Sequence, residues 1–590
     1  MLHPRQAMKA IREAWKEYVL DALLSFASEQ GLEVERESLE RELIVERPPK
    51  PELGDLAVPM FPYAKTLRMA PQKIAESVAA TLNEKNRGKC ETAGPYLNVW
   101  LSRPAVAEEV LGAVDREGER YGHSERFSGR KVMVEFSCPN TNKPLHLGHL
   151  RNDALGESVS RILGAAGAEV RKVNLINDRG VHICKSMLAY REFGEGKTPE
   201  SEERKSDHFV GDYYVKFNQW AGQDKSAETQ ARQMLQQWEA GDEEVHELWK
   251  LMNRWAIEGI QETYRRTGIS FDEYYYESQT YAAGRDEVLK GLERGIFFKD
   301  EEGTVWVDLE EIDLDRKVLL RGDGTSLYLT QDIGTAIARH RDWPFDQLVY
   351  VVASEQRYHF TVLFHVLDKL GFDWAKNLYH LSYGMVNLPE GKMKSREGTV
   401  VDADDLLVEL ATMAKKEIEE KERDGTIEDI DATGEKIALA ALHYYLLQVQ
   451  PNKDMVFNPA ESLSFNGNTG PYLQYTGARI STMLRKAGDL PEFGEVDLSV
   501  LEEPGEWELV KHIAEFPEAV EQAAEQFNPA LLTSYAYELA RQFARYYHDN
   551  PIMVHEDPQI RAARLVLSKE VLRVLRNVLE LLNIPYIPVM

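Results

Sequence analysis

The sequence predicts an α/β protein with a doubly wound parallel sheet, a small α+β domain before it and an all-helical domain after it. Three observations predict this architecture. A buried strand, a loop, a helix and a second strand follow one another between residues 131 and 178. A further apolar strand lies at 346–354, and from about residue 402 strand signals fade while Leu and Ala recur at helical spacing. A strand–helix–strand unit of this length is typical of a parallel sheet covered by helices on both faces.

Chain length and composition limit the number of domains and the class of protein. A chain of 590 residues is long enough for about three to five domains. We expect boundaries at 1–120, 121–400 and 401–590, with a mostly helical, charged insertion near 185–300. Hydrophobic residues make up 43% of the chain and charged residues 28%, which is typical of globular proteins and excludes a disordered chain. No stretch of about 18 apolar residues predicts a membrane span. We therefore expect a cytoplasmic protein with no membrane partner.

Cysteine content and charge exclude further classes. The three cysteines are widely spaced and form no C-x-x-C pair, so the sequence predicts neither a disulfide framework nor a cysteine-based zinc site. The formal net charge of −28 argues against a protein that coats nucleic acid non-specifically, because such proteins need a broad basic surface. A local basic path on an acidic body remains compatible with this charge.

The N-terminal domain is predicted from a helix and a strand. An amphipathic helix is expected within 52–84, and 91–102 alternates apolar and polar residues like a strand. The polar stretch 116–131 is typical of a linker. In the middle domain, 131–137 and 170–178 are the expected buried strands, and the helix between them follows a loop with two prolines.

The C-terminal domain is predicted to be helical and to carry an uneven charge. Its last helix, 561–582, places leucines along one stripe. Acidic residues dominate 401–436 and 489–526, whereas 541–576 holds seven basic and four acidic side chains with tyrosines nearby. Basic side chains beside aromatic rings suit a single-stranded RNA loop. The alternative is a solvated helix face with tyrosines in the core.

The sharpest motif is His146-Leu147-Gly148-His149, which opens a helix directly after a buried strand. The helix N-terminus offers free N–H groups to phosphate, and two imidazoles three residues apart can donate to phosphate oxygens as negative charge develops. Gly148 allows a nucleotide to approach the backbone closely. Two ordinary surface histidines are the alternative. The position after a strand favours nucleoside triphosphate chemistry.

A second motif, GKMKSREGTVV at 391–401, is a short basic loop. Its side chains could close over a triphosphate and neutralise a departing pyrophosphate. By itself such a loop is more often simply solvated, and the preceding H-x-G-H motif favours the functional interpretation. The residues concerned are Lys392, Met393, Lys394, Ser395 and Arg396.

Together these motifs resemble the HIGH and KMSKS signatures of class I aminoacyl-tRNA synthetases, whose catalytic domain is Rossmann-like. The neighbouring residues resemble the arginyl-tRNA synthetase family over nearly the whole chain. The segments that carry this resemblance are VEFSCPNTNKPLHLGHLRND (134–153), SLYLTQDIGTAIAR (326–339), VASEQRYHF (352–360) and NTGPYLQYTGARI (468–480). The N-terminal stretch resembles the family's N-terminal domain, and the helical C-terminus resembles its anticodon-binding domain.

The resemblance implies an arginine–tRNA ligase that forms arginyl-adenylate and pyrophosphate from arginine and ATP, then moves arginine to the terminal adenosine of tRNA(Arg). His146 and His149 would bind the phosphates, Gly148 would pack on adenine, and Lys392 and Lys394 would assist pyrophosphate. The basic loop departs from K-M-S-K-S, since its second lysine position is Ser395. Lys143, three residues before His146, matches a lysine that looks like the substitute, so Lys143, Lys394 and Arg396 stay open as the pyrophosphate ligand. Met393, Ser395 and Arg396 would complete the ATP site.

Arginine recognition is implied by residues suited to a guanidinium. The N–H donors of a guanidinium lie in one plane and pair best with carboxylate oxygens. Glu135 and Asp332 match the acidic positions of the family, and Tyr328 matches a tyrosine near the guanidinium. Asn140 and Gln356 match polar positions near the α-amino and carboxylate ends of arginine.

The sequence is compatible with two functions for each of two further polar residues. His359 is either a group on the ATP side or a packed histidine, and Asn152 either orients the H-x-G-H motif or faces solvent. Contacts to tRNA are implied at five positions by the resemblance: Asn98, Trp100, Tyr475, Tyr547 and Met590.

Three functions are compatible with these motifs: an arginyl-tRNA synthetase, a small-substrate nucleotidyltransferase with the same H-x-G-H chemistry, and a synthetase-like protein that only binds tRNA. Smaller nucleotidyltransferases need no helical domain with a basic, aromatic face, and the combined presence of both histidines, Glu135, Asp332 and the basic loop argues against a decayed site. We expect the partners to be tRNA(Arg), L-arginine and ATP with Mg²⁺, with no zinc and no resident metal, in a monomer.

Overall fold

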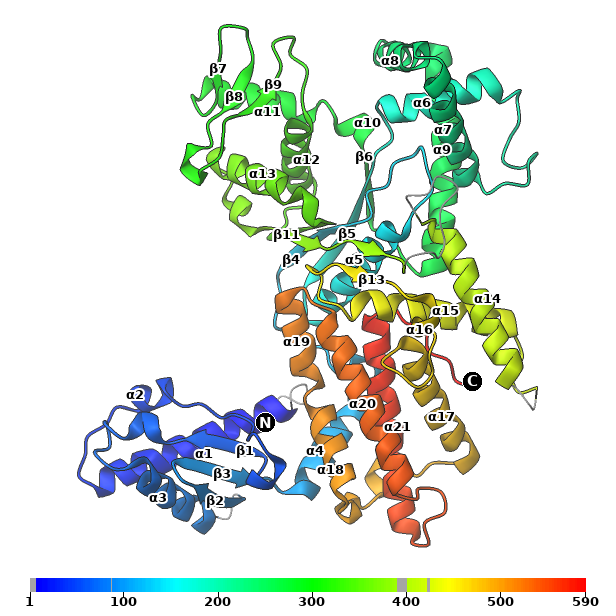
Figure 1. The fold of residues 1–590 in the computed structure, drawn as a ribbon. Helices are drawn as coiled ribbons and strands as arrows, with labels where there is room; N and C mark the ends of the chain where they lie inside the picture. Colours follow the sequence, from blue (N-terminus) through cyan, green and yellow to red (C-terminus); the bar gives the residue numbers. More distant parts are fainter. Residues whose placement is uncertain (1–6, 86–87, 390–400, 422–424) are drawn as a thin grey trace. The chain divides into compact units, whose positions relative to one another are not determined.

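The protein is described from a computed structural model, which covers residues 7–85, 88–389, 401–421 and 425–590. Its internal contacts divide it into two compact units (Figure 1). Unit 1 comprises Met1–Ser124, Thr476–Val520 and Tyr535–Asn577. Unit 2 comprises Glu125–Tyr475, Glu521–Ser534 and Val578–Met590.

Unit 1 contains a three-stranded antiparallel sheet in the order β1-β3-β2. The strands are β1 (Leu56–Pro59), β2 (Lys89–Ala93) and β3 (Tyr96–Trp100). Helix α3 (Pro71–Glu84) packs on the sheet and α1 (Ala7–Glu29) packs on α3. The single strand expected at 91–102 is instead part of a hairpin, because Gly94 turns the chain with a φ of +59° that favours glycine.

The helices of unit 1 pack around buried polar contacts as well as apolar side chains. The hydroxyl of Tyr121, a fully buried residue, donates to the carbonyl of Ile513 at 2.7 Å. The helices that lie wholly or partly in this unit include α2 (Arg36–Arg41), α4 (Arg103–Glu117), α17 (Gly470–Ala487), α18 (Pro504–Ala514), α19 (Phe516–Gln526), α20 (Ala530–Asp549) and α21 (Pro558–Leu581). The expected final helix is thus present as α21.

Unit 2 is built on a five-stranded sheet in the order β11-β10-β4-β5-β6, in which every neighbouring pair is parallel. The strands are β4 (Lys131–Glu135), β5 (Glu169–Ile176), β6 (Glu273–Tyr276), β10 (Gln347–Ala353) and β11 (Leu378–Tyr383). Val132, Met133 and Val134 of β4 are at most 1% exposed, as expected for a central strand covered on both faces. The predicted doubly wound sheet is confirmed.

The helices beside the sheet share its core. Helices α5 (Leu147–Ala165), α12 (Tyr328–Asp342) and α13 (Arg357–Lys369) pack against the strands. Met133, Ile333, Leu348 and Leu363 belong to one buried cluster. Later helices α14 (Ala403–Lys421), α15 (Ile430–Leu447) and α16 (Pro459–Ser462) follow, and β12 (Val386–Asn387) pairs in parallel with β13 (Met455–Val456).

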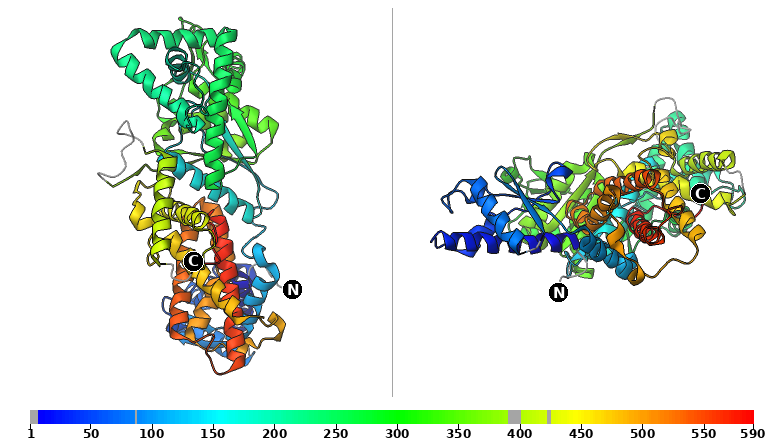
Figure 2. Two further views of the ribbon diagram at one scale, coloured as in Figure 1. Left: turned by 90° about the vertical axis from the view of Figure 1, so that its right-hand side faces the viewer. Right: turned by 90° about the horizontal axis from the view of Figure 1, so that it is seen from below.

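The predicted helical insertion is present with different limits. It consists of α6 (Val181–Phe193), α7 (Ser206–Gln223), α8 (Ser226–Glu239) and α9 (Glu243–Thr267), which enclose their own apolar core. Figure 2 shows α7 and α9, which pack against each other. The insertion ends earlier than residue 300, because β6 at 273–276 already belongs to the central sheet.

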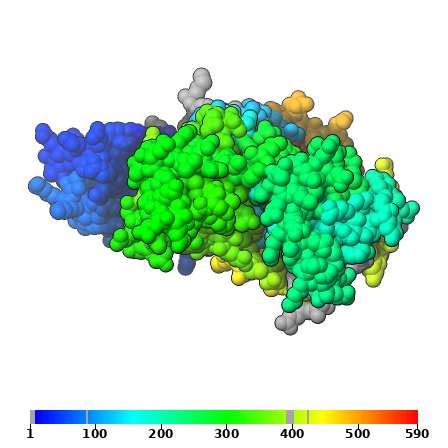
Figure 3. All heavy atoms as spheres, turned by 90° about the horizontal axis from the view of Figure 1, so that it is seen from above, coloured from blue at the N-terminus to red at the C-terminus, as the bar shows by residue number. Residues whose placement is uncertain are grey.

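A second lobe was not predicted. It carries a small antiparallel sheet of β7 (Phe298–Lys299), β8 (Val305–Val307) and β9 (Lys317–Leu320), preceded by α10 (Glu277–Thr280) and α11 (Ala283–Glu293). Its apolar side chains join the cluster of the parallel sheet. In Figure 3 this lobe and α6–α9 form neighbouring parts of one face of the unit.

Candidate active site

The strand order places a candidate site at the carboxyl ends of β4 and β10. The chain moves outward in one direction from β4 through β5 and β6, and in the other from β10 to β11. Ligands of such sheets bind where the order reverses, outside the carboxyl ends of the strands. Glu135 ends β4, Asn140 lies in the following loop, and Gln356 follows β10. The fold therefore brings these three predicted residues to one edge of the sheet.

The turn after β4 is strained and held by side-chain amides. Ser137 and Cys138 have φ values of +75° and +51°, which are unfavourable for residues with a side chain. Asn152 Oδ1 accepts from the Ser137 N–H at 2.6 Å, and Asn174 Oδ1 accepts from the Cys138 N–H at 3.0 Å. These bonds stabilise a turn that begins the loop leading to His146.

Asn152 is a buried, orienting residue and does not face solvent. It is 5% exposed, and its Nδ2 donates to the carbonyl of Val351 at 2.9 Å and to the hydroxyl of Tyr383 at 3.1 Å. One amide on α5 therefore joins the turn after β4 to β10 and β11. Of its two interpretations, the structure supports the one in which it orients the H-x-G-H region.

The H-x-G-H motif forms the N-terminus of α5. His146 is the N-cap; its side chain accepts from the backbone N–H of His149, while His149 Nδ1 accepts from the His146 N–H at 3.2 Å. The two rings lie 4.0 Å apart between centroids. This reciprocal capping box satisfies two N–H groups at the helix start. It also leaves one nitrogen of each neutral ring to carry the proton and to donate elsewhere.

Both imidazoles are held in the neutral form. Burial lowers the pKa of His146 to about 4, and the Lys143 ammonium adds to this shift. Burial, His146 and Lys143 together hold the pKa of His149 well below its ordinary value. Lys143 thus lies close enough to lower the pKa of both rings.

Gly148 leaves room for the ring of His146. A Cβ at this position would lie 2.7 Å from Cε1 and 2.9 Å from Nδ1 of His146. Real Cβ atoms do not approach other atoms this closely. A side chain at 148 would therefore displace the His146 ring.

The end of the basic loop lies beside the motif. Lys392, Met393, Lys394, Ser395 and Arg396 are outside the described residues. The segment that follows them is described: Leu147 N donates to Val401 O at 2.9 Å and Ala403 N donates to Leu145 O at 3.0 Å, on either side of a bridge between His146 and Asp402. The chain thus leaves the basic loop next to the phosphate-binding candidates.

On the arginine side, Glu135 already has a partner. Its carboxylate is ion-paired with Arg339, a residue of α12 that is 1% exposed and lies 4.8 Å from the ring centroid of Tyr275. A carboxylate has about four acceptor positions, so one guanidinium does not saturate it. Sequence reasoning missed Arg339, whose only signal is a basic residue on the apolar side of a predicted helix.

Asp332 is bonded to His359. The His359 Nε2 lies within hydrogen-bonding distance of Asp332 Oδ2, and both side chains are partly buried. His359 is therefore a partner of a predicted arginine ligand. The sequence had suggested either a group on the ATP side or a packed histidine. Burial, together with the charges of Glu135 and Asp332, raises the pKa of Tyr350 even though Arg339 opposes them. Both carboxylates therefore lie near one buried phenol.

The remaining predicted substrate residues are accessible. Tyr328 is 72% exposed in the first turn of α12, one helical turn before Asp332. Lys143, Asn140 and Gln356 are also exposed. These side chains are free to meet a ligand at the sheet edge.

The predicted tRNA contacts differ in exposure. Asn98 is 4% exposed inside β3, and this burial speaks against the contact predicted for it, whereas Trp100 is partly exposed with Lys89 Nζ 5.4 Å from its ring centroid. In unit 1, Tyr547 is 39% exposed beneath the Arg479 guanidinium. Tyr475 is equally exposed and Met590 is partly exposed, both in unit 2.

The basic, aromatic face expected at 541–576 is smaller than predicted. Tyr535 and Tyr546 are buried, and Arg564 is 5% exposed in an ion pair with Glu506 at 2.7 Å. These residues stabilise the helical packing instead of facing RNA. Helical spacing alone did not separate them from exposed side chains such as Tyr547.

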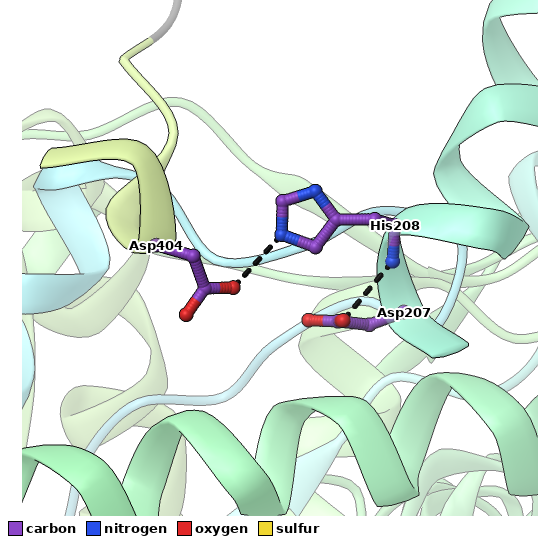
Figure 4. A group of neighbouring side chains, drawn as sticks. All are labelled: Asp207, His208 and Asp404. Carbon is purple, nitrogen blue, oxygen red and sulfur yellow. Dashed lines mark hydrogen bonds and ion pairs between the residues drawn. The ribbon is translucent and has the colours of Figure 1, made fainter. Parts of the chain in front are cut away.

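Among the described residues, Asp207, His208 and Asp404 are close enough to share a metal ion (Figure 4). The Lys205 ammonium already lies between the two carboxylates, 2.9 Å from Asp207 Oδ1 and 2.9 Å from Asp404 Oδ2. A bound cation would have to displace it. The group is therefore an ion-pair network.

The fold and this site define a class I aminoacyl-tRNA synthetase. The family described as "tRNA synthetases class I (R), catalytic domain" matches residues 114–459, which extends past the boundary expected at 400. The "Arginyl tRNA synthetase N terminal domain" matches 9–101, and the "DALR anticodon binding domain" matches 473–590. The chain belongs to the arginyl-tRNA synthetase family.

Relatives agree with this assignment over the full length. An arginine–tRNA ligase of Treponema denticola is 56% identical, covering 99% of this chain and 100% of the relative. That of Borreliella burgdorferi is 46% identical, covering 92% and 94%. A solved arginyl-tRNA synthetase of Thermus thermophilus has a TM-score of 0.76 at 28% identity, covering 98% and 100%. In the described part of the chain, no helix combines the length and apolar character needed to cross a membrane.

Proposed function

We propose that this chain charges tRNA(Arg) with L-arginine. A carboxylate oxygen of arginine attacks the α-phosphorus of ATP, and the bond from that phosphorus to pyrophosphate breaks. A hydroxyl of the terminal adenosine of tRNA then attacks the arginyl carbonyl, and AMP leaves. The observation that supports this most is the H-x-G-H capping box at the same sheet edge as the carboxylates Glu135 and Asp332.

In the first step, the protein acts by positioning and by charge. The capping box gives each neutral imidazole, His146 and His149, one remaining N–H, suited to a phosphate oxygen as charge develops. Lys143 supplies a positive charge beside both rings. ATP enters as its Mg²⁺ complex, and no zinc is needed. The functions proposed for Lys392, Met393, Lys394, Ser395 and Arg396 stay predictions.

Arginine would be held by charge at its guanidinium. Glu135 and Asp332 supply the carboxylates. Glu135 is ion-paired with Arg339, and Asp332 is hydrogen-bonded to His359. Tyr328 would cover the side chain, and Asn140 and Gln356 would meet the α-amino and carboxylate groups. The compact ammonium of lysine cannot form the same pair of bonds, so binding alone favours arginine.

For tRNA, we propose contacts at Trp100, Tyr475, Tyr547 and Met590. Tyr547 has the clearest support, since an exposed ring next to the Arg479 guanidinium is suited to stack on a base near phosphate. We propose that the chain acts as a monomer in the cytoplasm. Cys90, Cys138 and Cys184 are free thiols, which supports a reducing compartment.

The proposal is tested by ATP–pyrophosphate exchange with each amino acid in turn, with and without tRNA. We expect exchange with arginine alone, and in this family with cognate tRNA present. Exchange with lysine but not arginine would refute the proposal. Exchange with a small non-amino-acid substrate would indicate a nucleotidyltransferase, and tRNA binding without any exchange would indicate a protein that only binds tRNA.

Replacing Asp332 with Asn should raise the KM for arginine by roughly 10- to 100-fold, because one charge-assisted hydrogen bond worth about 1.5–3 kcal/mol is lost. The KM for ATP should change little. The matched control is Asp342→Asn, an exposed carboxylate at the end of the same helix. An unchanged arginine KM in the Asp332 variant would remove it from the arginine site.

Replacing Lys143 with Ala should slow arginyl-adenylate formation by roughly 10-fold or more, since a positive charge beside the phosphates is lost. Single-turnover formation of the adenylate is the measurement. The control is Lys250→Ala, which removes an exposed ammonium from α9. A near-normal rate would assign pyrophosphate stabilisation to Lys394 or Arg396 instead.

A further inference from the structure

The network around Lys205 lies outside every residue assigned above, and its geometry is unusually complete. Lys205 Nζ is 2.9 and 3.0 Å from the two Asp207 oxygens, 2.7 Å from Gly259 O, 2.8 Å from Thr263 Oγ1 and 2.9 Å from Asp404 Oδ2. An ammonium has three donor protons, so these acceptors more than use its capacity. Asp207 is fully buried and the Lys205 and Asp404 side chains are 22% and 13% exposed.

Asp404 is held from three directions. Its Oδ2 lies 2.8 Å from His208 Nε2 (Figure 4) and also accepts from Lys205. Its Oδ1 accepts from Thr263 Oγ1 at 3.0 Å. Lys205 and His208 belong to the start of α7, and Thr263 belongs to α9. Side chains of the insertion therefore hold the Asp404 carboxylate at the start of α14.

Close packing of α7 and α9 makes these contacts with Asp404 possible. A Cβ on Gly259 would lie 2.4 Å from the Asp207 backbone nitrogen and 2.5 Å from its Oδ1. Glycine at this position lets the start of α7 approach α9. Lys205 can then reach the Gly259 carbonyl and Thr263 on the same helix.

The residues before Asp404 connect the network to the H-x-G-H motif. Ala403 N donates to Leu145 O, Leu147 N donates to Val401 O, and His146 is bridged to Asp402. Asp404 is the next residue in the chain. Asp404 is thereby linked through two backbone hydrogen bonds to the loop end and first turn that carry His146 and His149.

We propose that Lys205 and Asp404 are positioning residues for adenylate formation: their ion pair fixes residues 401–404 and, through them, the first turn of α5. The inference rests on the proposed function. It assigns to the insertion an effect on the rate of the phosphate chemistry and little on recognition of arginine. Four of the five residues proposed to bind arginine lie on β4, α12 and the segment after β10, and the fifth, Asn140, lies near the start of the loop that leads to His146.

The first test is Lys205→Met, a substitution of similar length without charge. We expect kcat for arginine-dependent exchange to fall by about 10- to 100-fold, because small displacements of reacting groups have effects of this size. The KM for arginine should stay within about threefold. Lys205→Arg, which keeps the charge, should recover part of the rate.

A second variant keeps the test decisive if Lys205→Met folds poorly. Asp404→Asn preserves the shape of the side chain and removes its charge, and we expect the same split between kcat and KM. The matched control is Arg204→Met, which breaks the exposed Arg204–Asp212 ion pair one residue away. Thermal unfolding identifies the variants that remain folded.

Two results would overturn the inference. One is a folded Lys205→Met or Asp404→Asn variant with native kcat. The other is a joint loss of kcat, arginine affinity and tRNA affinity, which would show general structural damage. Failure of the proposed function is distinguishable, because the unaltered chain would then show no exchange with arginine.

Discussion

Replacing His149 with Ala is expected to lower the rate of ATP–pyrophosphate exchange by about 10²- to 10³-fold, the usual effect of removing one donor that stabilises transition-state charge. The substitution removes the donor and also the Nδ1 acceptor of the His146 N–H. His146 then loses its capping partner and its fixed ring orientation. The KM for arginine should be nearly unchanged, since the residues proposed to bind arginine do not include His149.

The measurement is exchange at saturating arginine, ATP and tRNA, with His365→Ala as the control. His365 is a partly buried histidine on α13 that faces Glu311, so its loss tests the general effect of truncating an imidazole. If the His149 variant kept a rate within about threefold of the unaltered chain, the phosphate-binding function of the capping box would be wrong.

Replacing Arg564 with Met should reduce the free energy of unfolding of unit 1 by about 3–5 kcal/mol, because it leaves a buried charge without its partner. Glu506 is 0% exposed; its Oε1 accepts from Arg564 Nε at 2.7 Å and from the Tyr546 hydroxyl at 2.9 Å. Its Oε2 accepts from the Glu503 N–H at 2.9 Å. The network joins α18, α20 and α21.

Hydrogen exchange of the amides in these three helices measures the effect locally, which matters because a chain of this size is not expected to unfold in one step. Arg541→Met, which breaks an exposed pair with Glu538, should change stability by less than about 1 kcal/mol. The double substitution Arg564→Met and Glu506→Leu should recover much of the loss. Unchanged exchange in the single variant would contradict the buried ion pair.

The sequence was sufficient for those parts of the fold that local patterns specify. Strands β4 and β10 are largely buried apolar runs, and the H-x-G-H motif marks the start of α5. Strand β5 mixes polar and apolar residues, and its buried side chains lie in its second half. Strand β6 was not recognised because it is four residues long and reads Glu-Tyr-Tyr-Tyr, without an aliphatic core. Strands β7, β8 and β9 have two to four residues each, which is too short to show the alternation of apolar and polar residues that predicts a strand.

Side-chain partnerships were harder to predict than elements. The sequence predicted Asp332 and Glu135 as arginine ligands, yet His359 and Arg339 become their partners only because α12, α13 and β4 are folded together. Lys205 meets Asp404 across 199 positions of sequence, a distance at which no pattern operates. Burial of Arg564 was missed for the same reason: a charged residue is tolerated inside when a distant partner, here Glu506, satisfies it.

The contact between Gly148 and the ring of His146 has a consequence for the evolution of the motif. The space that a Cβ at 148 would need is occupied by the neighbouring imidazole before any nucleotide arrives. A larger residue at 148 would therefore have to displace the His146 ring or follow its replacement by a smaller residue, and either change would alter the group proposed to donate to phosphate. The constraint runs in one direction: a side chain at 148 requires the side chain at 146 to move or to be smaller, whereas glycine at 148 places no such demand on residue 146.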